Sequence, residues 1–129
     1  MEEIKGERSE WGAIKIANEV VGIIAGLAAT EISGISAMSG GITGGITEAL
    51  GMKNLAKGVK VEVGEKETAI DLFVIVDYGV RIPDVSWQVQ ENVKRAIESM
   101  TGLSVVEVNV HVQGVKFPEQ MEEEQPRVR

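Results

Sequence analysis

His111 is the residue of this 129-residue chain best suited to acid–base catalysis or metal binding, and it is the only histidine. It alternates with Asn109 and Gln113 on the expected polar face of a strand. A general base needs a residue that orients it and a substrate pocket, and a metal ion needs three or four ligands. The neighbouring sequence supplies neither. We therefore predict a histidine on the surface of a strand, with no catalytic residue and no metal site.

The glycine-rich segment 39–45 is the second candidate, because backbone amides of such a turn before a helix bind anions. Its glycines fit neither common phosphate-binding spacing, no convincing strand precedes it and no lysine closes it. We expect a flexible loop and no cofactor. The alternative is a small-molecule site in which this loop and Arg81 hold an anionic metabolite such as an acyl-CoA.

Asp71 and Asp77 are a candidate pair of catalytic carboxylates. They lie six residues apart on one expected strand, which places them on the same face about 20 Å apart, too far to flank one bond. We expect solvated or strand-end charges. The sequence has no cysteine, which excludes thiolate nucleophiles, disulfides and cysteine-ligated metals. These observations together predict a protein that is not an enzyme.

Trp87 is the strongest candidate for recognition rather than chemistry. It lies off the apolar stripe of its expected helix, and tryptophan is enriched among interface anchors. The candidate interaction surface consists of Trp87 with a polar rim of Asp84, Gln90, Glu91 and Lys94. We predict that it docks a partner protein or a second copy of the chain. The alternative is a singly exposed tryptophan of no consequence.

The charge balance limits the kinds of partner. The chain has 13 Lys and Arg against 20 Asp and Glu, a net charge of −7, which disfavours nucleic acid. The longest apolar stretch, 20–29, is too short to cross a bilayer, and the charged N-terminus is unlike a signal peptide. We expect a cytoplasmic protein without direct membrane insertion.

The elements that position these residues follow from hydrophobic periodicity. A short strand over 12–16 precedes a helix that begins near a capping Asn18 and ends before Ser33 and Gly34. The expected core stripe of this helix is Val20, Ile23, Ile24, Leu27 and Ala28.

A hairpin is expected next, with strands 59–63 and 68–77 around a turn at 64–67. The second of these strands is apolar on both faces, which is typical of an interior strand. A second helix begins at Pro83 and Asp84 and ends at 101–102, with a core stripe that runs from Val85 to Met100. Ion pairs of Glu91 with Arg95 and of Lys94 with Glu98 are expected on its outer face. A strand over 106–112 follows. The strand–helix–strand order indicates a crossover between parallel strands.

The fold class expected from this order is α+β in two layers. A small mixed β-sheet, with three main strands plus a short N-terminal strand, packs against two main helices. We expect a flexible arm at 1–11, one domain at 12–117 and a disordered acidic tail at 118–129. The predicted core residues are Val20, Ile24, Leu27, Leu72, Val74, Val89, Val93, Ile97, Val108 and Val110.

Six short segments carry a resemblance to a known family. They are Gly12-Ala13-Ile14-Lys15-Ile16, the run from Ile24 to Ile35, Tyr78-Gly79-Val80-Arg81-Ile82-Pro83, Gln88-Val89-Gln90-Glu91-Asn92-Val93, Met100-Thr101-Gly102-Leu103 and the run from Val108 to Val115. In this order and spacing the chain resembles the alkaline shock protein family of Gram-positive bacteria, especially its YqhY and YloU branches.

The resemblance implies a small cytosolic α+β protein without established enzymatic activity. Some members of the family are linked to envelope stress and held at the membrane by a separate anchor protein, and the YqhY branch is associated with acetyl-CoA carboxylase and fatty-acid synthesis. The expected function is therefore regulation by protein–protein docking, with a homo-oligomer as a further possibility. The resemblance supplies no catalytic residues.

Overall fold

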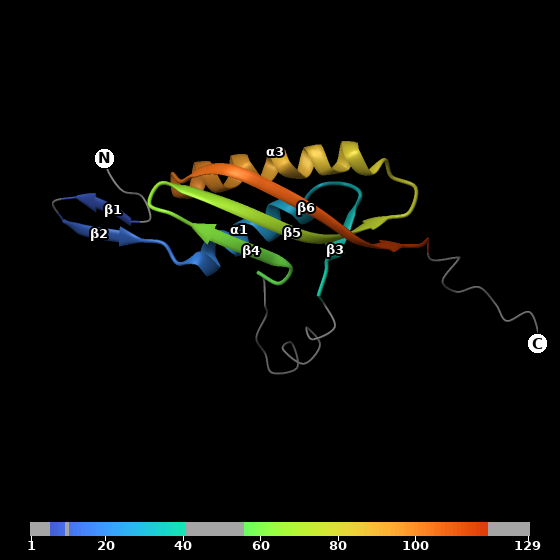
Figure 1. Cartoon of the computed structure of the whole chain (residues 1–129), viewed down its shortest axis with the longest axis horizontal. Coiled ribbons are helices and arrows are strands. Elements are labelled where there is room, and N and C mark those ends of the chain that lie inside the picture. Colours follow the sequence, from blue (N-terminus) through green and yellow to red (C-terminus); the bar gives the residue numbers. More distant parts are fainter. Residues whose placement is uncertain (1–5, 10, 41–55, 119–129) are drawn as a thin grey trace, which may run out of the picture.

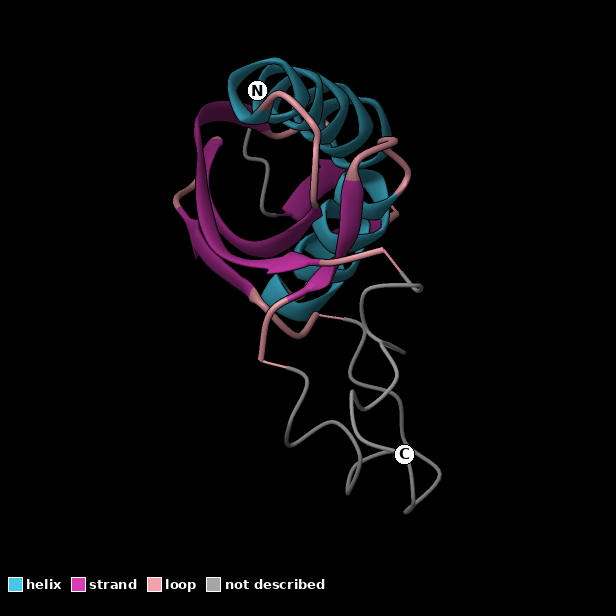
Figure 2. Cartoon of the chain, turned by 90° about the vertical axis from the view of Figure 1, so that its right-hand side faces the viewer, coloured by secondary structure: helices cyan, strands magenta, loops and turns pink. Residues whose placement is uncertain are grey.

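The computed structural model describes residues 6–9, 11–40 and 56–118. The elements are β1 (Gly6–Ser9), β2 (Gly12–Lys15), α1 (Asn18–Thr30), β3 (Ile35–Met38), β4 (Val59–Val63), β5 (Glu67–Asp77), α3 (Ile82–Thr101) and β6 (Ser104–Lys116). Both helices lie on one face of the sheet formed by β3 to β6 (Figure 1), and the sheet curves around them (Figure 2). The predicted two-layer α+β fold is confirmed.

Strand β5 is the centre of the sheet, as predicted. It pairs in parallel with β6 along its whole length, from Glu67 to Asp77. Strands β3 and β4 both pair antiparallel with β5, β4 along residues 68–72 and β3 along residues 74–76. Because β6 occupies one edge of β5 completely, β3 and β4 share the other edge, one after the other. The β4–β5 hairpin and the parallel crossover through α3 are therefore both present.

Helix α3 has the ends and the core stripe that the sequence predicts. Proline occupies its first turn, and Gly102 ends it in the left-handed conformation with φ +82°. Its buried residues are Val85, Val89, Val93 and Ile97, which pack against Ile70, Leu72, Val74 and Val76 of β5. Val108 and Val110 of β6 are partly buried against the same core. The prediction that Met100 belongs to this stripe is wrong, because its side chain is 69% exposed at the end of the helix.

Helix α1 begins at Asn18 but buries a different stripe, and the predicted capping role of Asn18 is wrong, because the N-cap is Ala17 and no side chain caps the helix. Two predicted core residues are wrong: Val20 is exposed, and Leu27 is 50% exposed. The buried residues are mostly small: Val21, Gly22, Ile24, Ala25, Gly26, Ala28 and Ala29. The reason is close approach: a Cβ at Gly22 would lie 3.1 Å from the Cβ of Ala56 next to β4. On the α3 side, Asn92 donates a hydrogen bond of 2.8 Å to the carbonyl oxygen of Ala28.

The N-terminal strand forms, but it pairs with β1 in a separate hairpin rather than with the main sheet. Strand β3 was not expected from the sequence. Most of the glycine-rich loop, from residue 41 on, and the expected acidic tail from residue 119 lie outside the described residues.

Candidate functional site

His111 lies on the face of the sheet opposite the helices, next to partners distant in sequence. The register pairs Asp71 with Asn109 and Phe73 with His111, so side chains of β5 and β6 lie side by side. The Nε2 of His111 lies 3.1 Å from Oδ1 of Asp71, and Nδ2 of Asn109 donates to the same oxygen over 3.1 Å. The imidazole also stacks on the ring of Phe73, with 4.5 Å between centroids.

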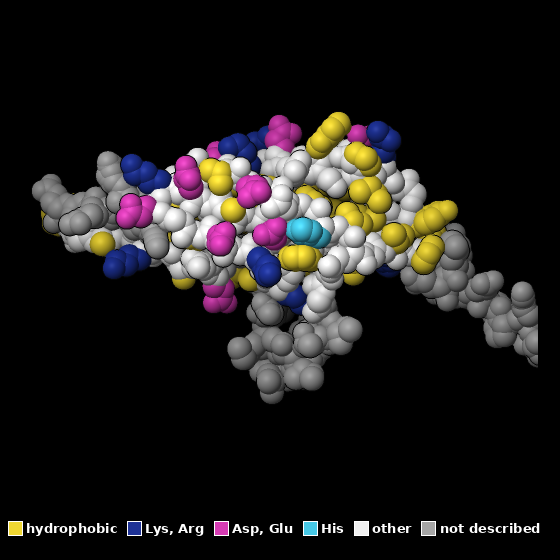
Figure 3. All heavy atoms as spheres, in the orientation of Figure 1, with side chains coloured by type: hydrophobic (Ala, Val, Ile, Leu, Met, Phe, Trp, Pro, Cys, Tyr) yellow, Lys and Arg dark blue, Asp and Glu magenta, His cyan; other side chains and the backbone are white. Residues whose placement is uncertain are grey.

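The cluster of Asp71, Asn109 and His111 was not anticipated by the sequence analysis. The expectation that Asp71 is simply solvated needs correction, since it accepts hydrogen bonds from both partners and its side chain is 38% exposed. The hydrogen bond from His111 lowers the pKa of Asp71 most, and the one from Asn109 lowers it further. Figure 3 shows the imidazole beside a carboxylate on this open face. Asp77, at the end of β5, is only half-buried.

The low pKa of Asp71 gives a prediction. We expect His111→Val to raise the pKa of the Asp71 carboxyl toward its ordinary value, and Asn109→Ala to raise it less, because each variant removes a donor to the ionised form. The measurement is a carboxyl-carbon NMR titration. The Glu98 carboxyl serves as the internal control, because Lys94 and the Val105 amide hold its pKa low. A pKa of Asp71 that stays in place in both variants contradicts the geometry.

The lowered pKa of Asp71 also makes the stability of the fold depend on pH. The folded-state pKa of Asp71 lies below the unfolded one, so its ionised form stabilises the fold above the unfolded pKa. This contribution is lost as the pH falls through the folded-state pKa. The advantage of the native chain over Asp71→Asn is therefore largest near neutral pH and declines in the acid range.

The chemistry available to this cluster is limited. A carboxylate that orients an imidazole is two thirds of a nucleophilic triad, but no serine or threonine hydroxyl is hydrogen-bonded to His111 in the part of the chain that the structure describes. Within the same residues, no group of three His, Cys, Asp or Glu side chains could hold a metal ion. The cluster orders side chains on the open face and defines no catalytic reaction.

Trp87 is 65% exposed on α3, which agrees with its expected position off the core stripe. Two polar residues of its rim, Gln90 and Lys94, make hydrogen bonds within the protein. Gln90 donates over 3.0 Å to the carbonyl oxygen of Val108, and Lys94 bonds Glu98 at 2.8 Å and the carbonyl oxygen of Val105 at 3.5 Å. These bonds fasten the outer side of α3 to β6.

The other rim charges are paired along the helix. Asp84 lies 3.1 Å from Arg81, and Glu91 lies 3.7 Å from Arg95. The predicted ion pairs of Glu91 with Arg95 and of Lys94 with Glu98 are thus both present. Arg81 is paired with Asp84 and does not line the cleft beside Gly40. Most of the glycine-rich loop of the alternative anion site lies outside the described residues.

The apolar end patch is the exposed hydrophobic surface around Trp87 that sequence reasoning missed. It consists of Tyr78, Ile82, Trp87, Val115 and Phe117, all exposed, which lie just after β5, in the first two turns of α3 and at the end of β6. The rings of Tyr78 and Phe117 are 5.5 Å apart. Figure 3 shows hydrophobic side chains gathered at this end of the molecule, where β6 finishes and α3 begins. The sequence contains both aromatic residues, Tyr78 and Phe117, but it does not show that they lie side by side. They are brought together by the β5–β6 pairing, in which the Tyr78 amide donates to the carbonyl oxygen of Lys116 over 2.9 Å.

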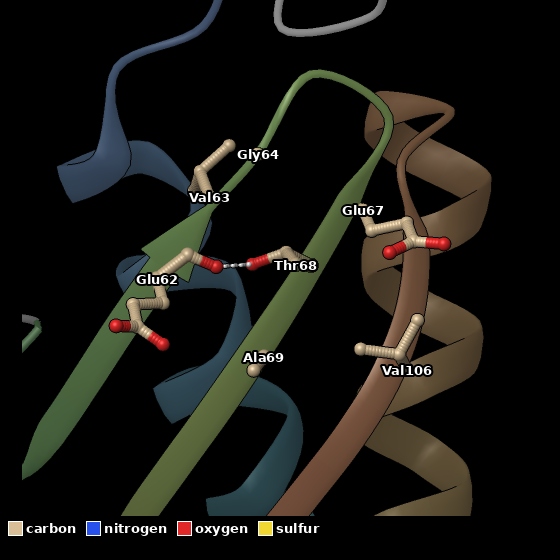
Figure 4. Close-up of a pocket in the computed structure, with 7 residues that line it drawn as sticks. All are labelled: Glu62, Val63, Gly64, Glu67, Thr68, Ala69 and Val106. Atoms are coloured by element: carbon tan, nitrogen blue, oxygen red, sulfur yellow. Dashed lines mark hydrogen bonds between the residues drawn. The ribbon is translucent and has the colours of Figure 1, made fainter.

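A hollow of about 360 Å³ lies at the opposite end, beside the β4–β5 turn (Figure 4). Thr68 is nearly fully buried there, and its hydroxyl donates to the carbonyl oxygen of Glu62 over 2.9 Å. The carboxylates of Glu62 and Glu67 lie on opposite sides of β5 and do not converge. The hollow therefore presents no polar group arranged for a ligand.

The fold and the site define a small two-layer α+β protein with exposed apolar side chains at one end and no complete catalytic set among its described residues. No helix within those residues is long and apolar enough to cross a membrane. Residues 6–117 match the alkaline shock protein 23 family, described by a cell envelope-related function, and the chain belongs to this family.

Relatives support this assignment. YqhY of Bacillus subtilis is 40% identical over 119 residues, 92% of this chain and 88% of YqhY. YloU of the same organism is 40% identical over 111 residues, 84% of this chain and 92% of YloU. A stress response regulator gls24 homolog of Streptococcus pyogenes is 32% identical over 114 residues, 88% of this chain and 64% of that protein. None of these names denotes an enzyme.

Among solved structures, MamM-CTD aligns with a TM-score of 0.48 at 12% identity, over 78% of this chain and all of that one. A likeness this loose identifies no function.

Proposed function

We propose that this chain is a non-enzymatic cytoplasmic regulator that acts by docking to another protein through the apolar end patch. The observation that carries the proposal is the gathering of five exposed large hydrophobic side chains at one end of the molecule. Large contiguous apolar surface is uncommon on proteins that work alone and marks sites of association. Trp87, with Asp84 and Glu91 nearby on α3, supplies an aromatic anchor with a charged border.

Family membership supports the cellular role that we propose for this docking. The family is described by a cell envelope-related function, and a gls24 homolog is named a stress response regulator. We propose that this chain likewise acts in the envelope stress response or in the control of fatty-acid synthesis. Its partner in the first case is a membrane-anchor protein and in the second a subunit of acetyl-CoA carboxylase. Self-association through the same patch is the alternative use of this surface.

Trp87→Ala tests the proposal. We expect it to weaken partner binding or self-association by about 1–3 kcal/mol, because a desolvated aromatic anchor is lost. The free energy of unfolding of the monomer should change by no more than about 0.5 kcal/mol, since the ring is exposed. Analytical ultracentrifugation measures self-association. Quantitative co-purification from the native cell measures binding to carboxylase subunits or to an anchor protein.

Met100→Ala is the matched control. It also removes an exposed apolar side chain from α3, but from the other end of the helix. Equal effects of the two variants on association would remove the special role of the patch. A large loss of stability in Trp87→Ala with unchanged association would show that Trp87 belongs to the core instead.

A further inference from the structure

The edge of the sheet is interrupted beside Phe73. Strand β3 ends next to Val74 and β4 begins next to Leu72, so neither strand covers the residue between them. Instead, the amide of Ser39 donates to the Phe73 carbonyl oxygen over 2.7 Å, and the Phe73 amide donates to the Gly58 carbonyl oxygen over 2.8 Å. The chain leaves the sheet after Ser39 and returns at Gly58.

A cleft of about 460 Å³ opens at this interruption, within the range of small-molecule sites. Phe73 lines it, on the face of the sheet that no helix covers in the described ranges. His111 stacks against the Phe73 ring from the β6 side. The neighbours of Phe73 on the other side, Ser39 and Gly58, are too small to cover the ring. Among the described residues, the Phe73 ring is therefore supported by His111 on one side and left available on the other to stack with a planar ligand.

The cleft is also positively charged, although the chain as a whole carries a net charge of −7. Lys57 and Lys60 both line it, and neither ammonium group has a salt bridge within the described residues. Asp71, the cross-strand partner of Lys60, accepts hydrogen bonds from His111 and Asn109, and the charge of Lys60 also lowers its pKa. Asp71 does not line the cleft, whose charged lining residues are Lys57 and Lys60.

Two polar side chains complete the wall. The hydroxyl of Ser39 donates over 2.9 Å to Oε1 of Gln113, which leaves the amide N–H groups of Gln113 as donors at the cleft. Lysine ammonium groups and amide donors bind phosphate oxygens, and aromatic rings stack with nucleobases. The acidic surface elsewhere disfavours a long polyanion, since a polymer would extend past Glu62 and Glu107 on the same face.

We propose that the cleft formed by Ser39, Lys57, Gly58, Lys60, Phe73 and Gln113 binds a mononucleotide. The base stacks on Phe73, and the phosphates lie against Lys57 and Lys60. This site is separate from the apolar end patch and does not depend on the docking function.

Titration of the full chain with ADP, adenosine and inorganic phosphate tests the proposal, with two-dimensional NMR and calorimetry as readouts. We expect saturable shifts of the Phe73, His111 and Gln113 resonances with ADP and a dissociation constant below about 1 mM. Adenosine and phosphate should each bind at least about fivefold more weakly, because each makes half of the contacts. Absence of saturable shifts with ADP overturns the site, and phosphate binding as tightly as ADP overturns the stacking and with it the nucleotide.

Variants separate the two contributions. The double variant Lys57→Gln, Lys60→Gln should weaken ADP binding at least about fivefold, whereas the double variant Lys66→Gln, Lys116→Gln, which removes the same number of charges at exposed positions outside the cleft, should leave it unchanged. Phe73→Leu should weaken ADP but not phosphate. Equal losses in the two double variants would point to general electrostatics and overturn the site. Because Lys57 and Lys60 are at the surface, the double variant should fold normally. Its ADP affinity therefore tests the site even if Phe73→Leu lowers the folding stability.

Discussion

Ile97→Ala is expected to lower the free energy of unfolding by about 2–5 kcal/mol, whereas Leu27→Ala should lower it by about 1 kcal/mol or less. Ile97 is fully buried against β5, so its truncation removes transfer free energy and leaves a cavity. Leu27 projects from α1 with half of its side chain in solvent, and alanine is at least as good a helix former. Urea denaturation of both variants gives the two values.

The pair of variants is its own control, since both remove aliphatic carbons from a helix. Equal losses would mean that α1 is rotated relative to the orientation described here, with Leu27 in the core. A loss below about 1 kcal/mol for Ile97→Ala would mean that α3 does not cover the sheet with this face.

Gly58→Ala should cost about 3 kcal/mol of stability, compared with about 1 kcal/mol for Gly102→Ala. Both glycines have nearly the same left-handed backbone, with φ +79° and φ +82°, so both variants carry the same conformational strain. They differ in space: a Cβ at Gly58 would lie 3.0 Å from the Ser39 carbonyl oxygen and 3.1 Å from that of Phe73. No rotamer change can move these backbone atoms away.

A Cβ at Gly102 has nothing within 4 Å, so this variant isolates the backbone strain. Chemical denaturation measures both variants, and circular dichroism shows whether each still folds. Stability losses that match would indicate that β3 and β4 do not approach each other at Gly58 as the structure has them.

The sequence was informative where hydrophobic residues follow one period. Strand β5 alternates buried and half-buried residues along its length, and α3 has one clear apolar stripe, so both were placed correctly. Helix α1 is apolar on several sides, and periodicity alone could not choose between stripes. The buried stripe of α1 is set by the close approach of Gly22 to the chain next to β4, and this approach depends on where β4 lies. Strand β3 has four residues and a register shift between Ile35 and Ala37, which removes the alternation that marks a strand.

The candidate sites also differ in how far the sequence predicts them. Exposure of Trp87 follows from the α3 stripe and was foreseen, since it is a property of one helix. The Asp71–His111 contact and the Tyr78–Phe117 contact join residues about 40 positions apart, and each requires the parallel register of β5 with β6. Such a register is set by the packing of the crossover helix, and no local pattern in either strand specifies it.

The central position of β5 has a consequence for how the chain folds. Every strand of the main sheet makes its ladder with β5, and none of β3, β4 or β6 pairs with another of the three in the described part of the chain. The β4–β5 hairpin is local and can close within microseconds, whereas β6 can add only after α3 has been traversed. We expect the hairpin contacts to form early and the formation of the β6 ladder to limit the folding rate. Loss of β5 leaves the remaining strands without any hydrogen-bonded neighbour, so the sheet should unfold in a single cooperative step.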